Sequence, residues 1–171
     1  MTQTIQRKLN DSAFIRWSAL ILIALMMFFA YMFVDMLSPL KELLDQQLNW
    51  NSSTFGTYAA SEYFLNVFCF FLIFAGIILD KMGIRFTGLL SASLMVIGAC
   101  IKFYAMSEWF AGTGLEAWLN SCWVSLPGSA KLSCLGFMIF GCGCEMAGTT
   151  VSKAIAKWFK GKEMAMAMGL E

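Results

Sequence analysis

The sequence contains no histidine. The proton transfers that enzymes most often assign to an imidazole are therefore excluded, and so are nucleophilic triads that contain histidine. Charge is also scarce, because Asp, Glu, Lys and Arg together make up 13% of the residues. No nucleotide-binding loop is present. We therefore expect no enzymatic activity, no cofactor and no nucleic-acid partner.

Apolar residues, in contrast, are abundant. They make up 59% of the 171 residues, and the mean hydropathy is +0.68, more than a soluble core needs. Four apolar runs lie at residues 17–37, 55–79, 84–106 and 134–156. Each has about the 20 residues with which a helix crosses a hydrocarbon core, and in lipid the backbone must satisfy its own hydrogen bonds. The sequence predicts an all-α, multi-pass membrane protein with four transmembrane helices and the start of a fifth.

These runs divide the chain into five segments. Residues 1–16 are predicted to form a cytoplasmic tail, and residues 17–106 the first three transmembrane helices. Residues 107–133 form a loop on the other side, with tryptophans typical of a membrane interface and a short interfacial helix. Residues 134–156 form the fourth helix. Residues 157–171 hold a basic loop and about nine residues of a fifth helix, half a bilayer in length, so we expect the protein to continue.

The basic residues are distributed unevenly. If the N-terminus is cytoplasmic, nine lie in cytoplasmic segments: Arg7, Lys8, Arg16, Lys81, Arg85, Lys153, Lys157, Lys160 and Lys162. Only three lie in the opposite half: Lys41, Lys102 and Lys131. This bias predicts a cytoplasmic N-terminus. The short N-terminal tail has no dileucine sorting signal, so we expect a cell (inner) membrane, with a lysosomal membrane as the alternative.

The six cysteines do not indicate a metal site. Cys142 and Cys144 are two residues apart, and on a helix their side chains point about 200° apart. No further ligand lies nearby in the sequence. A disulfide between Cys122 and Cys134 is an alternative to free thiols.

A glycine and charge pattern follows the second apolar run. It comprises Gly76, Asp80, Lys81, Gly83 and Arg85. Gly76 permits close approach of a neighbouring helix, and Gly83 permits a tight turn. The spacing resembles the loop motif between helices two and three of the major facilitator superfamily. Ile84 stands where that motif has a further base.

The resemblance implies a role for these charges. In the superfamily they form a latch against a helix of the C-terminal half, which holds the outward-open state and breaks in each cycle. The alternative is that Lys81 and Arg85 only mark the cytoplasmic side.

Glu145 lies near the middle of the fourth apolar run. An uncompensated charge there costs at least about 2.5 to 3.5 kcal/mol, so it should face a cavity or a partner. At 100° per residue, Glu145 shares one face with Gly141, Gly148 and Ser152. This small and polar face predicts a substrate pathway, and a structural hydrogen-bonding role for Glu145 is the alternative. Asp35, Glu62 and Tyr31 are further substrate-binding candidates near the outer end, or else structural contacts between helices.

The run from Phe140 to Glu163 carries a closer resemblance, as does the string Tyr31-x-Phe33-x-Asp35. Both are similar to the branch called major facilitator superfamily domain-containing protein 1, whose members are lysosomal dipeptide transporters. The resemblance implies alternating-access transport of small peptides, with Glu145 at the substrate ammonium. It also implies that an arginine beyond Glu171, in a C-terminal part of the same protein, meets the substrate carboxylate. Two alternatives are an organic-anion or drug antiporter of the superfamily and a four-helix membrane scaffold.

Overall fold

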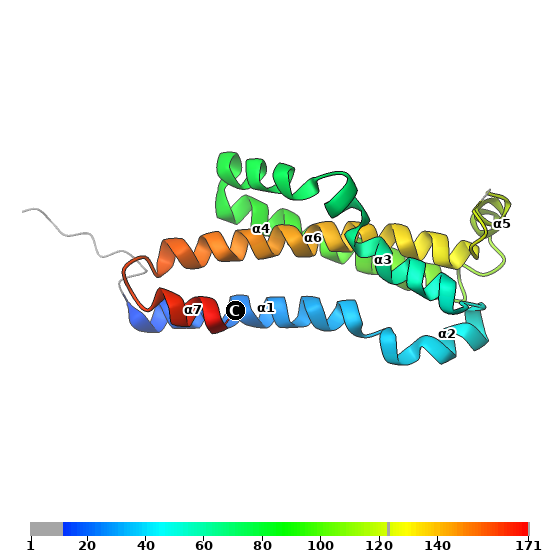
Figure 1. Ribbon diagram of the computed structural model, residues 1–171, viewed down its shortest axis with the longest axis horizontal. Coiled ribbons are helices and arrows are strands. Elements are labelled where there is room, and N and C mark those ends of the chain that lie inside the picture. Colours follow the sequence, from blue (N-terminus) through cyan, green and yellow to red (C-terminus); the bar gives the residue numbers. More distant parts are fainter. Residues whose placement is uncertain (1–11, 123, 171) are drawn as a thin grey trace, which may run out of the picture.

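The computed structural model describes residues 12–122 and 124–170. Within these ranges all regular elements are helices and no strand occurs, so the all-α prediction is confirmed. The elements are α1 (Ala13–Asp35), η2 (Ser38–Leu40), α2 (Lys41–Leu48), α3 (Ser52–Phe68), α4 (Phe71–Met106), α5 (Gly114–Ser121), α6 (Gly128–Trp158) and α7 (Met164–Leu170). The long helices run along one axis, with α2 and α5 at one end and α7 at the other (Figure 1).

The helix labelled α4 consists of two antiparallel helices joined at Gly83 (Figure 1). Gly83 has φ 82° and ψ 172°, a backbone conformation that essentially only glycine adopts. The Thr87 hydroxyl donates a hydrogen bond of 2.9 Å to the Gly83 carbonyl and so stabilises the start of the second helix. The predicted short turn after the second apolar run is therefore present.

The second apolar run is not one helix, and the prediction of a continuous span over residues 55–79 is wrong. Phe70 has φ 51°, a left-handed conformation that is uncommon for a residue with a side chain. The α3 helix therefore ends at Phe68, and a new helix begins at Phe71. By length and composition, three helical stretches of the described residues could cross a membrane: Ala13–Leu48, Phe71–Met106 and Gly128–Trp158. The second of these includes the reversal at Gly83, after which its longer part follows.

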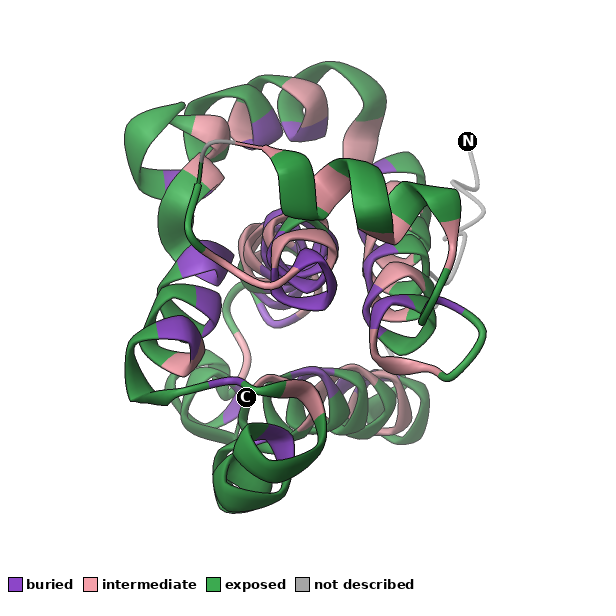
Figure 2. Cartoon of the chain, turned by 90° about the vertical axis from the view of Figure 1, so that its right-hand side faces the viewer, coloured by how far each residue is buried: buried purple, intermediate pink, exposed green. Residues whose placement is uncertain are grey.

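The α6 helix forms the centre of the bundle. Figure 2 looks along the bundle and shows a largely buried helix surrounded by the others. Glycines bring α4 and α6 together, because a Cβ on Gly143 would lie 2.7 Å from the Ser91 carbonyl oxygen. The helix begins at Gly128, earlier than the predicted start at residue 134, and its added first turns are also mostly buried.

The end of the bundle that carries α5 has an aromatic core. Tyr58 of α3 stacks on Phe137 of α6, with ring centroids 4.7 Å apart and an interplanar angle of 14°. Trp50 is fully buried beside Tyr58, and its indole nitrogen donates a 3.1 Å hydrogen bond to the Ser129 hydroxyl. These contacts set the position of α3 against α6.

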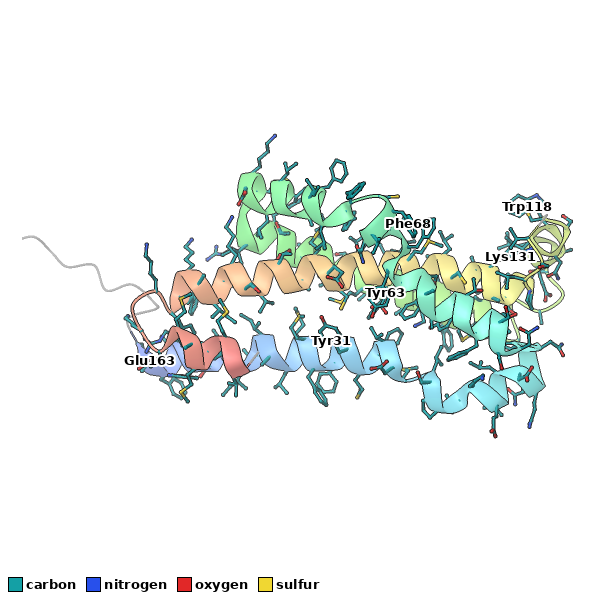
Figure 3. The ribbon with its side chains drawn as sticks, in the orientation of Figure 1. Tyr31, Tyr63, Phe68, Trp118, Lys131 and Glu163 are labelled. Atoms are coloured by element: carbon teal, nitrogen blue, oxygen red, sulfur yellow. The ribbon has the colours of Figure 1, made fainter. Side chains whose placement is uncertain are left out.

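The predicted short helix in the long loop is present as α5. The Lys131 ammonium donates a 2.6 Å hydrogen bond to the Leu119 carbonyl and so joins the last turn of α5 to α6. Trp118 remains exposed on α5 (Figure 3). The cysteines of the described residues are free thiols, so Cys122 and Cys134 are not paired.

Candidate functional site

Glu62 lies buried where α3 crosses α6, with 3% of its surface exposed. A Cβ on Gly141 of α6 would lie 2.8 Å from the Glu62 Cγ, so the missing side chain of Gly141 makes room for Glu62. Gly141 was predicted to line a substrate pathway together with Glu145. In the structure α3 covers Gly141, because the backbone and side chain of Glu62 fill the space beside it.

Glu145 is half-buried near the middle of α6. It shares one face of α6 with Gly141, which packs against Glu62 of α3, and with Gly148, which lies closest to Met27 of α1. Glu145 is therefore on the side of α6 that faces these two helices. Figure 3 shows Tyr31 and Tyr63 at nearly the same level along the bundle. Within residues 12–122 and 124–170, the Glu145 carboxylate has no hydrogen-bond or ion-pair partner. Glu145 is therefore partly exposed and has no counter-charge within the described residues.

Asp35 and Glu62 line one small cavity between α1 and α3, which we call the carboxylate pocket. It has a volume of about 140 Å³, and its other walls include Phe55, Tyr58, Tyr63 and Phe137. The structure thus brings together two of the predicted substrate-binding residues at a single pocket. Glu145 does not line this pocket, but its charge acts on Glu62.

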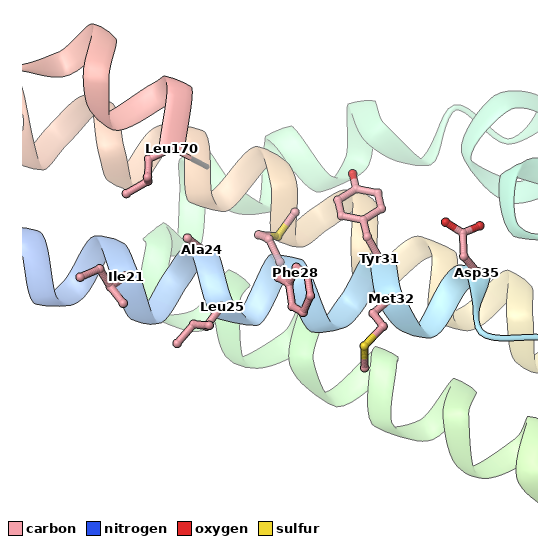
Figure 4. A pocket seen from close by; sticks show the side chains of 9 residues that line it. Ile21, Ala24, Leu25, Phe28, Tyr31, Met32, Asp35 and Leu170 are labelled. Carbon is pink, nitrogen blue, oxygen red and sulfur yellow. The ribbon is translucent and has the colours of Figure 1, made fainter.

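Tyr31 and Asp35 also lie along a larger, mostly apolar groove on α1 (Figure 4). The groove has a volume of about 690 Å³ and extends to Leu170 of α7. Figure 4 shows the Tyr31 hydroxyl and the Asp35 carboxylate on the same side of α1. Asp35 therefore connects the groove with the carboxylate pocket, and Tyr31 is one helical turn away from it.

Lys102 is a charged residue that sequence reasoning had placed only among the outer topology markers. It is 3% exposed, and its ammonium lies among rings from three helices: Phe33 at 4.4 Å, Tyr58 at 5.3 Å, Phe137 at 4.0 Å and Phe140 at 5.7 Å. Within the described chain no group accepts a hydrogen bond from this ammonium. A lysine inside an apolar run is itself the sequence signal for such a site.

The energetics indicate that the rings alone do not compensate Lys102. Desolvating an ammonium costs several kcal/mol, whereas cation–π contact contributes about 2 kcal/mol when desolvated. A nearby carboxylate could supply further compensation, and Glu62 lines a pocket that shares the rings of Tyr58 and Phe137 with Lys102. The two side chains are not within 4.0 Å of each other, since the ion pairs of the described residues are found elsewhere.

At the opposite end of the bundle, the glycine and charge motif is partly engaged within this chain. Asp80 pairs with Lys153 of α6, one of the bases that the sequence predicts to mark the cytoplasmic side. Both side chains are substantially exposed, so the pair contributes about 0 to 1 kcal/mol and breaks easily. Lys81 and Arg85 are exposed. A Cβ on Gly76 would meet no atom of the described chain within 4 Å, so the close helix approach expected there is not formed here.

A second ion pair at this end had not been predicted. The buried Arg16 of α1 lies 3.0 Å from the Glu163 carboxylate, just before α7. Its guanidinium also lies 5.3 Å from the centre of the Phe159 ring. Figure 3 shows Glu163 beside the first turns of α1. This contact joins the start of α1 to the connection between α6 and α7.

A bundle of long apolar helices with a carboxylate, Glu62, and a lysine, Lys102, buried between them defines a class, that of multi-pass membrane proteins with a charged internal site. The family model of the Major Facilitator Superfamily matches residues 23–170. The chain therefore belongs to this superfamily of membrane transporters, and the multi-pass prediction is confirmed. No curated protein and no solved structure matches the chain.

Proposed function

We propose that this chain is the N-terminal part of an alternating-access carrier for small peptides. Membership of the superfamily supports transport of a small solute across a bilayer. The similarity of the Phe140 to Glu163 run to dipeptide transporters supports peptides as the solute. The observation that carries the proposal is the half-buried Glu145 carboxylate on the face of α6 toward α1 and α3, which has no cationic partner in the described chain.

In this proposal Glu145 receives the ammonium of the peptide. A carboxylate at this depth is costly without a counter-charge, so a cationic ligand offsets a penalty that the empty protein bears. Asp35, Glu62 and Tyr31 lie along the route from the outer end, where they add negative charge and a hydroxyl donor. A base outside this chain, in the C-terminal part of the transporter, binds the peptide carboxylate.

The exposed pair of Asp80 with Lys153 supports a latch role for the motif at residues 76–85. A latch must break in every cycle, and a pair worth about 0 to 1 kcal/mol meets that condition. In the proposal Lys81 and Arg85 remain available for contacts with the C-terminal half.

We also propose a cytoplasmic N-terminus and a location in the cell membrane. Arg16, the bases around the Gly83 turn and the lysines at the end of α6 all gather at the α7 end of the bundle (Figure 1). Concentration of bases at one end favours that end as the cytoplasmic one.

The test is uptake by the complete transporter that contains this chain, reconstituted into proteoliposomes. The probes are radiolabelled alanyl-alanine and, for the antiporter alternative, radiolabelled p-aminohippurate. We expect uptake of the dipeptide and not of the organic anion. Glu145→Gln should lower dipeptide uptake at least about tenfold, because one lost charge-assisted contact is worth about 1.5 to 3 kcal/mol.

The matched control is Glu108→Gln, which removes a carboxylate from an exposed position between α4 and α5. Uptake by this variant should equal that of the wild type. Unchanged dipeptide uptake by Glu145→Gln would contradict the ammonium-binding role. Uptake of p-aminohippurate without uptake of the dipeptide would overturn the choice of substrate.

A further inference from the structure

Lys102 is the buried charge that the proposed mechanism has not used. Its side chain leaves α4 and ends among aromatic rings of α1, α3 and α6, where no acceptor within the described chain takes its protons. Aromatic faces stabilise a cation but accept no conventional hydrogen bond. The ammonium therefore contacts the rings but donates no hydrogen bond to the described residues.

The aromatic cage of Lys102 and the carboxylate pocket share two walls. Tyr58 and Phe137 each contact the ammonium by their ring faces, and each also lines the pocket that contains Glu62 and Asp35. Lys102 and the carboxylate pocket are therefore neighbours that share these two rings. A lysine side chain is long and flexible, so rotation about its own bonds can move the ammonium toward that pocket.

Glu62 is the buried carboxylate of the pocket that shares Tyr58 and Phe137 with this cage. Asp35 of α1 lines the same pocket, and Glu145 lies one turn beyond Gly141, the residue of α6 that packs against Glu62. Three carboxylates therefore converge on one region whose only buried lysine among the described residues is Lys102. Like charges repel one another, and a mobile internal cation offsets that repulsion.

We propose that Lys102 is the internal counter-cation of Glu62, and that it takes the place of the substrate ammonium when the carrier is empty. The inference rests on the proposed function and extends it to the specificity of the same site. With peptide bound, the substrate ammonium supplies the positive charge and Lys102 stays in its aromatic cage. Without peptide, Lys102 moves toward Glu62, so that the empty carrier can reorient without an uncompensated carboxylate.

The pairing is tested without any substrate, by thermal unfolding of the complete transporter in detergent. The variants are Glu62→Gln, Lys102→Met and the two combined. Each single change leaves one buried charge without its counter-charge, whereas the double change removes both charges. We expect the double variant to melt about 2 to 4 °C above the value that the sum of the two single shifts predicts. The control combines Glu62→Gln with Lys41→Met, which replaces an exposed lysine on α2. The melting-temperature shifts of these two changes should be additive.

The role in the empty carrier is tested by comparing net uptake with exchange. Proteoliposomes either lack substrate or hold unlabelled alanyl-alanine, and radiolabelled alanyl-alanine is added outside. Only net uptake requires the empty carrier to return. We expect Lys102→Met to lower net uptake at least about tenfold while exchange stays within about threefold, and Lys102→Arg to retain more net uptake than Lys102→Met.

The outcomes separate this inference from the proposed function. Additive melting shifts for Glu62→Gln and Lys102→Met would overturn the pairing. Equal loss of net uptake and exchange in Lys102→Met would show a merely structural lysine and overturn the role in the empty carrier. If the wild type carries no dipeptide but the melting shifts are non-additive, the proposed peptide substrate fails while the assignment of Lys102 to Glu62 stands.

Discussion

The Lys153 ammonium of α6 lies 2.5 Å from the Asp80 carboxylate of α4. The same ammonium is 3.5 Å from the Leu79 carbonyl oxygen, so one lysine contacts both the charge and the backbone just before the Gly83 turn. The pair connects the turn between two antiparallel helices to the last turns of the central helix. Both side chains of the pair are substantially exposed, so it contributes little to the stability of the fold.

The first prediction concerns this pair. Asp80→Asn should change the melting temperature by less than about 3 °C, because the pair is exposed and worth at most about 1 kcal/mol. Uptake of radiolabelled alanyl-alanine should nevertheless fall, because the balance between the two orientations of the carrier shifts. The exchanged pair Asp80→Lys with Lys153→Asp should recover part of the uptake. No recovery, or a large loss of stability, would argue against a latch.

The second prediction concerns the two glycines of the motif. Gly83→Ala should cost about 1 to 3 kcal/mol, since an alanine at φ 82° and ψ 172° is strained whatever space surrounds it. Gly76→Ala is the matched control. It lies within a helix with open space around it, so added helix propensity should leave stability equal or raise it by up to about 1 kcal/mol. Thermal unfolding in detergent measures both.

A lower melting temperature for Gly76→Ala than for Gly83→Ala would contradict this account of the turn. If Gly76→Ala alone were destabilising in the complete transporter, Gly76 would be packed against a helix of the C-terminal half, as the resemblance to the superfamily motif implies.

The third prediction concerns the crossing of α3 and α6. Gly141→Ala should destabilise the protein by about 1 to 3 kcal/mol, because the new methyl group would collide with Glu62. Gly148→Ala lies two turns further along the same helix, where the nearest atom would be the Met27 Cε at 3.8 Å, an ordinary contact. It should melt within about 2 °C of the wild type. Equal shifts for the two variants would show that α3 does not press against Gly141.

The fourth prediction concerns orientation in the membrane. Ala111→Cys at the α5 end and Lys160→Cys at the α7 end both introduce a thiol at an exposed position. In intact cells, with the native cysteines replaced, a membrane-impermeant maleimide should label Ala111→Cys and leave Lys160→Cys unlabelled until the cells are opened. The basic residues at the α7 end are the physical reason. Labelling of Lys160→Cys in intact cells would reverse the topology.

Sequence reasoning was most successful where the solvent imposes the structure. A bilayer requires helices with internally satisfied backbones, so run length and polarity are enough to predict an all-α membrane chain. The turn at Gly83 was also predictable, because a glycine among charges after an apolar run indicates where the chain reverses. The prediction of one helix over residues 55–79 failed because nothing in the composition of that run marks Phe70 as a residue with positive φ.

The candidate site was only partly predictable. Glu145, Glu62 and Asp35 could be selected because carboxylates are conspicuous in apolar runs. Lys102 is likewise a charged residue within an apolar run, but the sequence alone predicted it only as one of the outer bases and not as a residue inside the bundle. Its cage draws on rings at positions 33, 58, 137 and 140, and no spacing in the chain relates these four to one another.

The amino-acid order alone was enough to establish that this chain lies in a membrane as helices and where its bases gather, since those properties depend on local composition and on the lipid. How α3 rotates against Gly141, which side of α6 carries Glu145, and which rings surround Lys102 depended on the packing of helices far apart in the chain. Packing selects one rotation and one depth for each helix from many that hydrophobicity permits, because side chains in contact must fit without overlap.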